Sequence, residues 1–327
     1  MGSTTSSKVI SPQLCCSGDQ FDPAHGVEEF AVVTDASPRL ESGPKGSLSD
    51  PRLQGIRPTT TVRGLLSEMD EELRRAKVEA KAKSAQHLRL RVVSSSVLPK
   101  GTLFNISALG AEESLRKARD GRTYFGCKKR AEKGNKSSPV LNDVILPASD
   151  PELTERHRGR HFMIEFDPTR DAYFIKDLGN GFGAFAKLDS QLTLRDNNLL
   201  HIGESFVVVN LVPGKTQEAE PRLRLKLFGG PNTGEVFYFS VSELVQGRIR
   251  VGRNHLCEIP IEDGLISKVQ FTIHYEEETG WMLADGDWEQ QRPSTNGTWV
   301  YLSEEYELYN GMVFKVSSTL MQAMLWI

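Results

Sequence analysis

Apolar and polar positions alternate in short runs from about residue 88 to the end of the chain. Clear examples lie at 162–166, 173–175, 206–211 and 236–239, where β-branched and aromatic residues are followed by turn residues. Runs of this length with a period of two are typical of strands that bury one face. Many such strands separated by turns predict an all-β fold, built as antiparallel two-sheet sandwiches.

The strand-like runs occur twice along the chain. Several matching residues are 108 positions apart: Tyr173 and Trp281, Gly203 and Gly311, and Phe206 and Phe314. An internal repeat of this length indicates duplicated domains. We therefore expect two tandem sandwiches, at residues 88–212 and 222–327, joined by a short polar linker at 213–221.

An amphipathic helix is predicted before the first sandwich, at residues 61–87. Leu65, Leu66, Met69 and Leu73 fall on one helical face among acidic and then basic residues. We expect this helix to pack on the first sandwich. The alternative is a helix that binds a partner or associates with a second copy of itself.

The first 60 residues are rich in Ser, Thr, Pro and Gly and poor in aromatic residues, so we expect them to be disordered. The opening Met-Gly-Ser-Thr-Thr-Ser fits the pattern for N-myristoylation of Gly2. One myristoyl chain gives only marginal membrane binding, and Cys15 and Cys16 are candidate sites for a second acyl chain. A chance match in a serine-rich segment is the alternative.

Length and composition narrow the class of protein. The chain of 327 residues is long enough for two domains. It has no apolar run long enough to span a bilayer and no secretion signal at its start, so an intracellular protein of the cytoplasm or nucleus is expected, with a possible lipid anchor. Its 4 cysteines show no spacing typical of zinc or disulfides, so we expect no metal and no cofactor.

Charge argues against a nucleic-acid partner. Residues 222–327 hold 9 Lys and Arg against 14 Asp and Glu, so this region is acidic. Binding to a nucleic acid requires the neutralisation of many phosphates at once, which an acidic surface opposes. A single phosphate group is a better match for this region.

Three polar motifs in that acidic region have side chains that can bind a phosphate group. They are Gly252-Arg253, Ser267-Lys268 and the run Ser294-Thr295-Asn296-Gly297. Arginine offers a planar fork for phosphate oxygens, serine and lysine offer a hydroxyl and an ammonium, and asparagine offers an amide for a peptide backbone. No nucleophile stands beside a base, so the motifs indicate binding and no catalysis.

These motifs, in this order and spacing, resemble the signature of forkhead-associated (FHA) domains. Members of that family are antiparallel β-sandwiches whose loops at one end bind phosphothreonine peptides. The resemblance implies that Arg253, Ser267 and Lys268 bind the phosphate. It also implies that Thr295 and Asn296 hold the peptide main chain.

Three further residues are expected to support the site: Gly252, Gln270 and Gly297. Gln270 stands where the family usually has histidine. Its amide can still bridge neighbouring backbone groups, so we expect a weaker brace and a site that functions.

The first repeat has the same strand-like runs as the second but lacks most residues of the phosphate-binding motifs. Cys127 follows Gly126 where arginine is expected, Arg158 occupies the serine position and Phe182 the asparagine position, whereas His161 matches the family histidine. Loss of the guanidinium and the amide removes charge-assisted hydrogen bonds of about 1.5–3 kcal/mol each. Phosphothreonine binding by this repeat is therefore not expected.

The favoured interpretation is a non-catalytic adaptor that binds phosphothreonine-containing proteins through residues 222–327. A variant is self-recognition, in which phosphorylated Thr59 in the N-terminal segment is the ligand. The alternative is a structural scaffold of two sandwiches with a vestigial phosphate site. An enzyme is the weakest possibility, because His157 and His161 lack a third metal ligand and no phosphate-cradling or nucleophile motif is found.

Overall fold

The structure of the protein is a computed structural model, which describes residues 62–131, 134, 136–147, 159–181, 183–212 and 220–327. Strands dominate the described residues, and antiparallel pairing dominates the sheets, so the predicted all-β class is confirmed. One helix, α2 (Val62–Lys81), precedes the strands.

The strands lie on either side of residues 213–219, which divide the chain into two halves. The first half of the chain contains β1 (His87–Ser94), β2 (Leu103–Ser107), β3 (Gly110–Ala111), β4 (Arg122–Gly126), β5 (Val144–Ile145), β6 (Phe162–Asp167), β7 (Ala172–Asp177), β8 (Ala184–Lys187), β9 (Leu192–Thr193), β10 (Asn198–Ile202) and β11 (Ser205–Val212). The second half contains β12 (Arg222–Phe228), β13 (Val236–Ser240), the 3-10 turns η1 (Val241–Glu243) and η2 (Val245–Gly247), β14 (Arg248–Gly252), β15 (Ile259–Pro260), β16 (Phe271–Glu276), β17 (Gly280–Asp285), β18 (Trp299–Tyr301), β19 (Tyr306–Glu307), β20 (Val313–Val316) and β21 (Thr319–Trp326).

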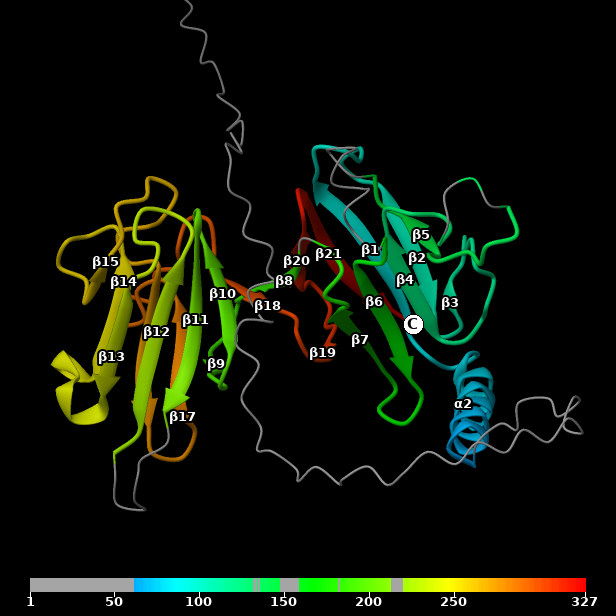
Figure 1. Ribbon diagram of the computed structural model, residues 1–327, viewed down its shortest axis with the longest axis horizontal. Helices are drawn as coiled ribbons and strands as arrows, with labels where there is room; N and C mark the ends of the chain where they lie inside the picture. Colours follow the sequence, from blue (N-terminus) through cyan, green and yellow to red (C-terminus); the bar gives the residue numbers. More distant parts are fainter. Residues whose placement is uncertain (1–61, 132–133, 135, 148–158, 182, 213–219) are drawn as a thin grey trace, which may run out of the picture.

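The two halves exchange their last three strands. In one sandwich, which we call sandwich A, β1–β8 are completed by β19, β20 and β21 from the second half. In sandwich B, β12–β18 are completed by β9, β10 and β11 from the first half. Figure 1 shows the exchange by colour: red β20 and β21 lie beside cyan β1, and green β10 and β11 lie beside yellow β12.

Sandwich A and sandwich B share one continuous sheet. Its 11 strands run in the order β13-β12-β11-β10-β18-β8-β20-β21-β1-β2-β3, and a separate 5-stranded sheet covers each sandwich. At the centre, β8 pairs antiparallel with β18 through Phe185↔Tyr301, Ala186↔Val300 and Lys187↔Trp299. β8 and β18 occupy equivalent places in the two sandwiches, so their pairing has the geometry of a two-fold dimer contact within one chain. We call this pairing, where the two halves of the chain cross, the crossing.

The buried cores confirm that the exchange is a feature of packing as well as pairing. Phe314 of β20 is fully buried in sandwich A, where its ring meets Phe162 edge-on at 5.9 Å. Leu200 and Val209 of the first half are fully buried in the core of sandwich B. Each core therefore loses apolar contacts if the other half is removed.

The division expected from the sequence, 88–212 and 222–327, describes the order of strands along the chain but not the units that pack. Neither half closes on itself, because its last three strands lie in the other sandwich. The physical reason is that alternation along a strand sets which face is buried and not which strand lies beside it, so the pattern of these strands fits either sandwich.

The helix packs on sandwich A, but not through the face that its periodicity predicts. Val78 is fully buried in the core, and Arg74 forms an ion pair with Glu165 of β6 at 3.1 Å. Met69 and Leu73 of the predicted apolar face are 65% and 58% exposed. The prediction that the helix packs through this face is wrong for these two residues, because the core contact is made from the opposite side.

The helix is also shorter than predicted. It ends at Lys81, and His87, the predicted last residue, instead begins β1 and pairs with Trp326 of β21. Backbone amides of Ser84 and Ala85 donate to the Lys81 carbonyl and close the helix there. The residues between helix and strand are therefore a turn.

A partly buried lysine lies where the two halves cross. The ammonium of Lys315 on β20 lies 4.5 Å from the ring centre of Trp299 and 5.6 Å from that of Phe185, and it contacts His201 Nδ1. Burial lowers the pKa of Lys315 to about 7. Burial and the neighbouring Lys315 lower the pKa of His201 to about 3, so this imidazole is neutral at physiological pH.

We predict that cutting the linker leaves the protein assembled. A protease site placed at 213–219 and cleaved under native conditions yields two fragments that stay together, because each sandwich contains strands of both. Size-exclusion chromatography and thermal melting of the cut and uncut protein provide the measurement. Elution as two separate fragments would contradict the exchange.

A second prediction concerns pH. Because the folded-state pKa of Lys315 lies below its ordinary 10.5, the charged form destabilises the fold below pH 7, and this penalty fades as the pH rises towards 10.5. Lys315→Met therefore raises the free energy of unfolding at pH 6–7 by roughly 1–4 kcal/mol, with little gain at pH 10. Denaturant titrations of both proteins at these pH values measure the difference. An equal gain at every pH would contradict the assignment.

Candidate functional site

The five residues predicted to bind the phosphopeptide come from three loops of sandwich B. Arg253 follows β14, Ser267 and Lys268 precede β16, and Thr295 and Asn296 precede β18. All five belong to the second half, as the sequence requires. The loops connect strands of the smaller sheet of sandwich B with each other and with the long sheet.

Hydrogen bonds bring the first two loops together. The Arg253 backbone amide donates to the Ser267 carbonyl at 2.9 Å, and the Asn254 amide donates to the Lys268 carbonyl at 3.1 Å. Gly252 is required at this approach, because a Cβ there would lie 2.4 Å from the Lys268 carbonyl oxygen. The arginine and the serine-lysine pair are thus fixed as neighbours by their own backbones.

The third loop joins the same cluster through Ser267. The Thr295 amide donates to Ser267 Oγ at 2.8 Å, and the Ser267 hydroxyl donates to Thr295 Oγ1 at 3.2 Å. Asn296 Nδ2 donates to the Leu265 carbonyl at 2.7 Å. The structure therefore brings together the backbones of all three predicted motifs.

Gln270 connects these loops from beneath. It is fully buried, and its amide oxygen accepts from the Ser267 backbone amide at 3.0 Å. Its Nε2 donates to Ser294 Oγ at 3.1 Å and to the Gly297 carbonyl at 2.9 Å. The glutamine thus joins the serine-lysine loop to the Thr295-Asn296 loop with one side chain, as a bridging brace must.

The sequence interpretation missed a second brace, formed by Asp285 and Ser294. One carboxylate oxygen of Asp285 accepts from the Ser294 backbone amide at 2.9 Å, and the other accepts from the Ser294 hydroxyl at 2.7 Å. Ser294 then accepts from the Gly297 amide at 2.9 Å. The sequence contains a signal for this brace, because an aspartate ends the apolar run at equivalent positions of both halves: Asp285 in β17 and Asp177 in β7.

The first half of the chain contacts one of the site loops through the hairpin between β10 and β11. The buried carboxylate of Asp263 accepts from the Glu204 backbone amide at 2.8 Å and from the Leu265 amide at 2.8 Å. Gly203, the residue before Glu204, has φ +50°, and a Cβ there would lie 2.1 Å from Asp263 Oδ2. The hairpin between β10 and β11 thereby holds the loop that carries Ser267.

Lys187 of β8 makes a further contact between the halves. A Cβ on Gly297, whose φ is +78°, would lie 2.5 Å from Lys187 Cε. Glycine accommodates both the positive φ and the lysine stem at this position. No sequence pattern of the second half alone could reveal this neighbour, because Lys187 comes from the first half and reaches the site through the pairing of β8 with β18.

Two cations of the site are available to a ligand. Arg253 and Lys268 are exposed, and within the described part of the chain their side chains have no ion pair. The neighbouring Arg250 differs, because Glu258 binds it at 2.9 Å and raises the pKa of this guanidinium. An arginine and a lysine without carboxylate partners can bind an anion without first breaking an ion pair.

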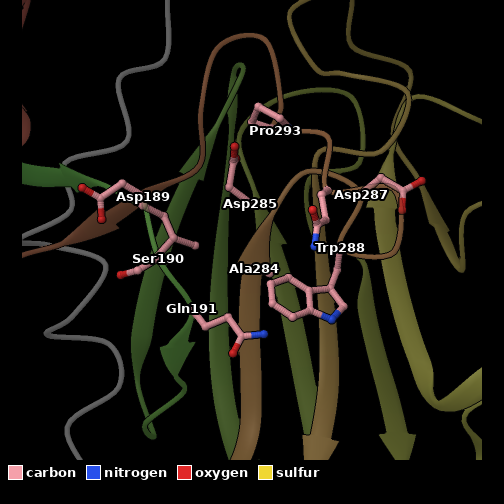
Figure 2. Close-up of a pocket in the computed structure, with 10 residues that line it drawn as sticks. Asp189, Ser190, Gln191, Ala284, Asp285, Asp287, Trp288 and Pro293 are labelled. Carbon is pink, nitrogen blue, oxygen red and sulfur yellow. The ribbon is translucent and has the colours of Figure 1, made fainter.

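A groove of about 330 Å³ lies beside this cluster (Figure 2). Its walls come from the segment after β8, including Asp189 and Gln191, and from the end of β17 and the loop after it, including Asp285 and Trp288. Trp288 is 46% exposed and stacks on His274 at 5.8 Å. Because Asp285 also binds Ser294, the groove shares a wall with the loop that carries Thr295.

The corresponding loops of the first half have different chemistry. Gly126 again approaches the next loop, since a Cβ there would lie 2.0 Å from the Gly159 carbonyl oxygen. Arg160 donates to the Leu141 carbonyl and stacks on Tyr124 at 3.9 Å, so its guanidinium is already engaged. Arg158 and Phe182, which depart from the motif, lie outside the described residues.

Other predicted features also fall outside the described residues. These include the candidate lipidation sites Gly2, Cys15 and Cys16, and His157. Lipidation therefore stays a prediction. Where side chains are placed, no group of three or more His, Cys, Asp or Glu is arranged to hold a metal ion. No helix in the described ranges is long and apolar enough to cross a membrane.

Comparison with known families identifies the domain. Residues 249–317 match the FHA domain, and this range contains all five predicted phosphopeptide-binding residues. FHA domains are generally phosphothreonine-binding, non-catalytic modules for protein interaction. No curated protein matches the chain.

We predict that Asp263→Ala destabilises the site loop although Asp263 is not expected to touch the ligand. The substitution leaves the Glu204 and Leu265 amides without their acceptor, which costs about 1–3 kcal/mol. Denaturant unfolding measures this loss, and Glu262→Ala, an exposed neighbour, provides the control. Equal stability of the two variants would show that the contact between the halves does not support the loop.

Proposed function

We propose that the protein is a non-catalytic adaptor that binds phosphothreonine segments of partner proteins through the FHA domain in its second half. In this proposal Arg253 and Ser267 bind the phosphate, and Lys268 adds a second cation. Thr295 and Asn296 hold the peptide main chain beside the phosphothreonine. The match of residues 249–317 to the FHA domain supports the general class of activity.

The observation that carries the proposal is the hydrogen bonding of three motif loops to one another, two of them through one buried side chain. Gln270 binds the backbone of Ser267 and the carbonyl of Gly297, while Arg253 is fixed to Ser267 by a backbone hydrogen bond. Preorganised polar groups bind an anion with little further loss of conformational entropy. The glutamine thus replaces the usual histidine of the family in a site that keeps its loops together.

Phosphorylation is the switch in this proposal. A phosphate brings a charge of about −1.5 to −2 and several strong acceptor oxygens to a threonine. Arg253 can bind two of these oxygens side by side, which an unmodified hydroxyl cannot offer. The acidic character of residues 222–327 disfavours extended polyanions, so one phosphate on a peptide is the ligand that fits.

The first half has a supporting role in this proposal. We interpret it as an FHA-like copy that lacks the phosphate-binding residues and keeps the strands. Its β10–β11 hairpin holds Asp263 of the site loop, and its Lys187 packs on Gly297. Such a copy is retained because the site of the other half is built on it.

A structural scaffold with a vestigial site is the second candidate. The shared sheet of 11 strands favours it, because interlocked sandwiches form a rigid surface for partners. An oriented phosphothreonine peptide library separates the two functions. An adaptor selects phosphorylated sequences with preferences at flanking positions, whereas a scaffold selects no phosphorylated peptide.

We predict that Arg253→Ala abolishes discrimination between a phosphothreonine peptide selected from such a library and its unphosphorylated form. The wild type is expected to bind the phosphopeptide near micromolar affinity, about −8 kcal/mol. The variant loses a charge-assisted contact of about 1.5–3 kcal/mol and binds roughly tenfold to a hundredfold more weakly. Calorimetry with both peptides measures the ratio.

Arg222→Ala is the matched control, because it removes the same charge from an exposed position of β12 in sandwich B. Its discrimination ratio should equal that of the wild type. If Arg253→Ala also retains the wild-type ratio, the assignment of the phosphate site is wrong.

A further inference from the structure

The outward face of α2 carries an apolar stripe that nothing in the described structure covers. Met69 and Leu73 are 65% and 58% exposed, and Ala76 and Ala80 are also exposed. The spacings of four, three and four residues place these positions in one line along the helix. Two large apolar side chains in line with small ones form a seam suited to another helix.

The helix is held firmly enough to present this seam. On its opposite side Val78 is buried in the core of sandwich A. Glu71 binds Arg122 of β4 at 3.3 Å, and Arg74 binds Glu165 of β6 at 3.1 Å. Figure 1 shows α2 at the outer edge of sandwich A, away from sandwich B. The stripe therefore lies at a fixed place far from the phosphate loops along the molecule.

Charges beside the stripe divide into an acidic and a basic part. Asp70 and Glu72 are exposed near Met69, and Arg75 and Lys77 are exposed one turn further on, where one acidic residue, Glu79, is also exposed. Two such helices in antiparallel orientation place the acidic part of each opposite the basic part of the other. In parallel orientation like charges face each other, which is destabilising.

We propose that the exposed face of α2 is a self-association surface, on which the α2 helix of a second copy of this chain packs antiparallel. Met69 and Leu73 of each copy pack across the seam, where the small side chains of Ala76 and Ala80 allow close approach. A bilayer is a poorer occupant, because the exposed positions of α2 carry Asp70, Glu72 and Glu79 as well as basic residues.

The association is expected to be weak and dependent on concentration. One helix pair buries less surface than the 1,200–2,000 Å² typical of stable complexes. A weak dimer nevertheless has a consequence for the proposed function, because it carries two phosphothreonine sites. A partner phosphorylated twice then gains affinity from simultaneous binding to both.

Charge reversal in the full-length chain tests the proposal. Sedimentation velocity over a concentration series should show the wild type passing from monomer to dimer. Asp70→Lys with Glu72→Lys, and separately Arg75→Glu with Lys77→Glu, should each weaken self-association by about tenfold or more. An equimolar mixture of the two variants should form a heterodimer, and the chain with all four reversals should dimerise as the wild type does.

The apolar stripe is tested separately. Met69→Glu with Leu73→Glu should leave a monomer, whereas Val245→Glu, at a position 64% exposed on sandwich B, should not change the dimer. Circular dichroism and the affinity for a singly phosphorylated peptide should stay the same in every variant. These controls separate a failure of self-association from a failure of the phosphothreonine site.

Three results would overturn the proposal. The first is a wild type that is monomeric at all concentrations. The second is dimerisation as strong as that of the wild type in both variants that reverse only the acidic or only the basic residues. The third is binding to anionic lipid vesicles that Met69→Glu with Leu73→Glu abolishes in a chain that does not dimerise, which would assign the stripe to a membrane surface.

Discussion

The antiparallel contact between β8 and β18 determines how the rest of the molecule is assembled. Ala186 of β8 pairs with Val300 of β18, and on either side of this pair the chain enters the other sandwich. After β8 the chain supplies β9, β10 and β11 to sandwich B, and after β18 it supplies β19, β20 and β21 to sandwich A. The last three strands of each half are therefore buried in the other, and the apolar cores of both sandwiches depend on the same crossing.

This crossing explains why a half without the phosphate-binding motif is part of the site. The loop that carries Ser267 is held by Asp263, whose carboxylate accepts from the Glu204 amide of the first half. Gly297 has its positive φ beside the stem of Lys187, which also comes from the first half. The motif residues lie in one half of the sequence, whereas the geometry that orients them is shared.

Gln270, which stands where a histidine was expected, joins two loops of the candidate site with one side chain. Its position is fully buried, so every polar atom placed there needs a partner. The amide has one acceptor and two donors, and these connect Ser267 with Ser294 and Gly297. One glutamine side chain thus supplies the hydrogen bonds between these two loops.

The sequence by itself determined the all-β class and the match to the FHA domain, and it contains the five residues proposed to bind the phosphopeptide. These follow from local rules: alternation with a period of two, turn residues, and the chemistry of arginine, serine and asparagine at fixed spacing. The amphipathic helix was also visible, but its periodicity gave the wrong buried face, since Val78 packs on sandwich A while Met69 and Leu73 stay exposed.

Only the tertiary structure decided which strands close which sandwich. Two similar halves present equivalent apolar faces, so Phe314 has the same pattern whether it packs with its own half or with Phe162 of the other. The choice rests on contacts between residues more than a hundred positions apart, such as Ala186 and Val300. Local periodicity contains no information about such pairs, because it records which face of a strand is buried and not which strand lies beside it.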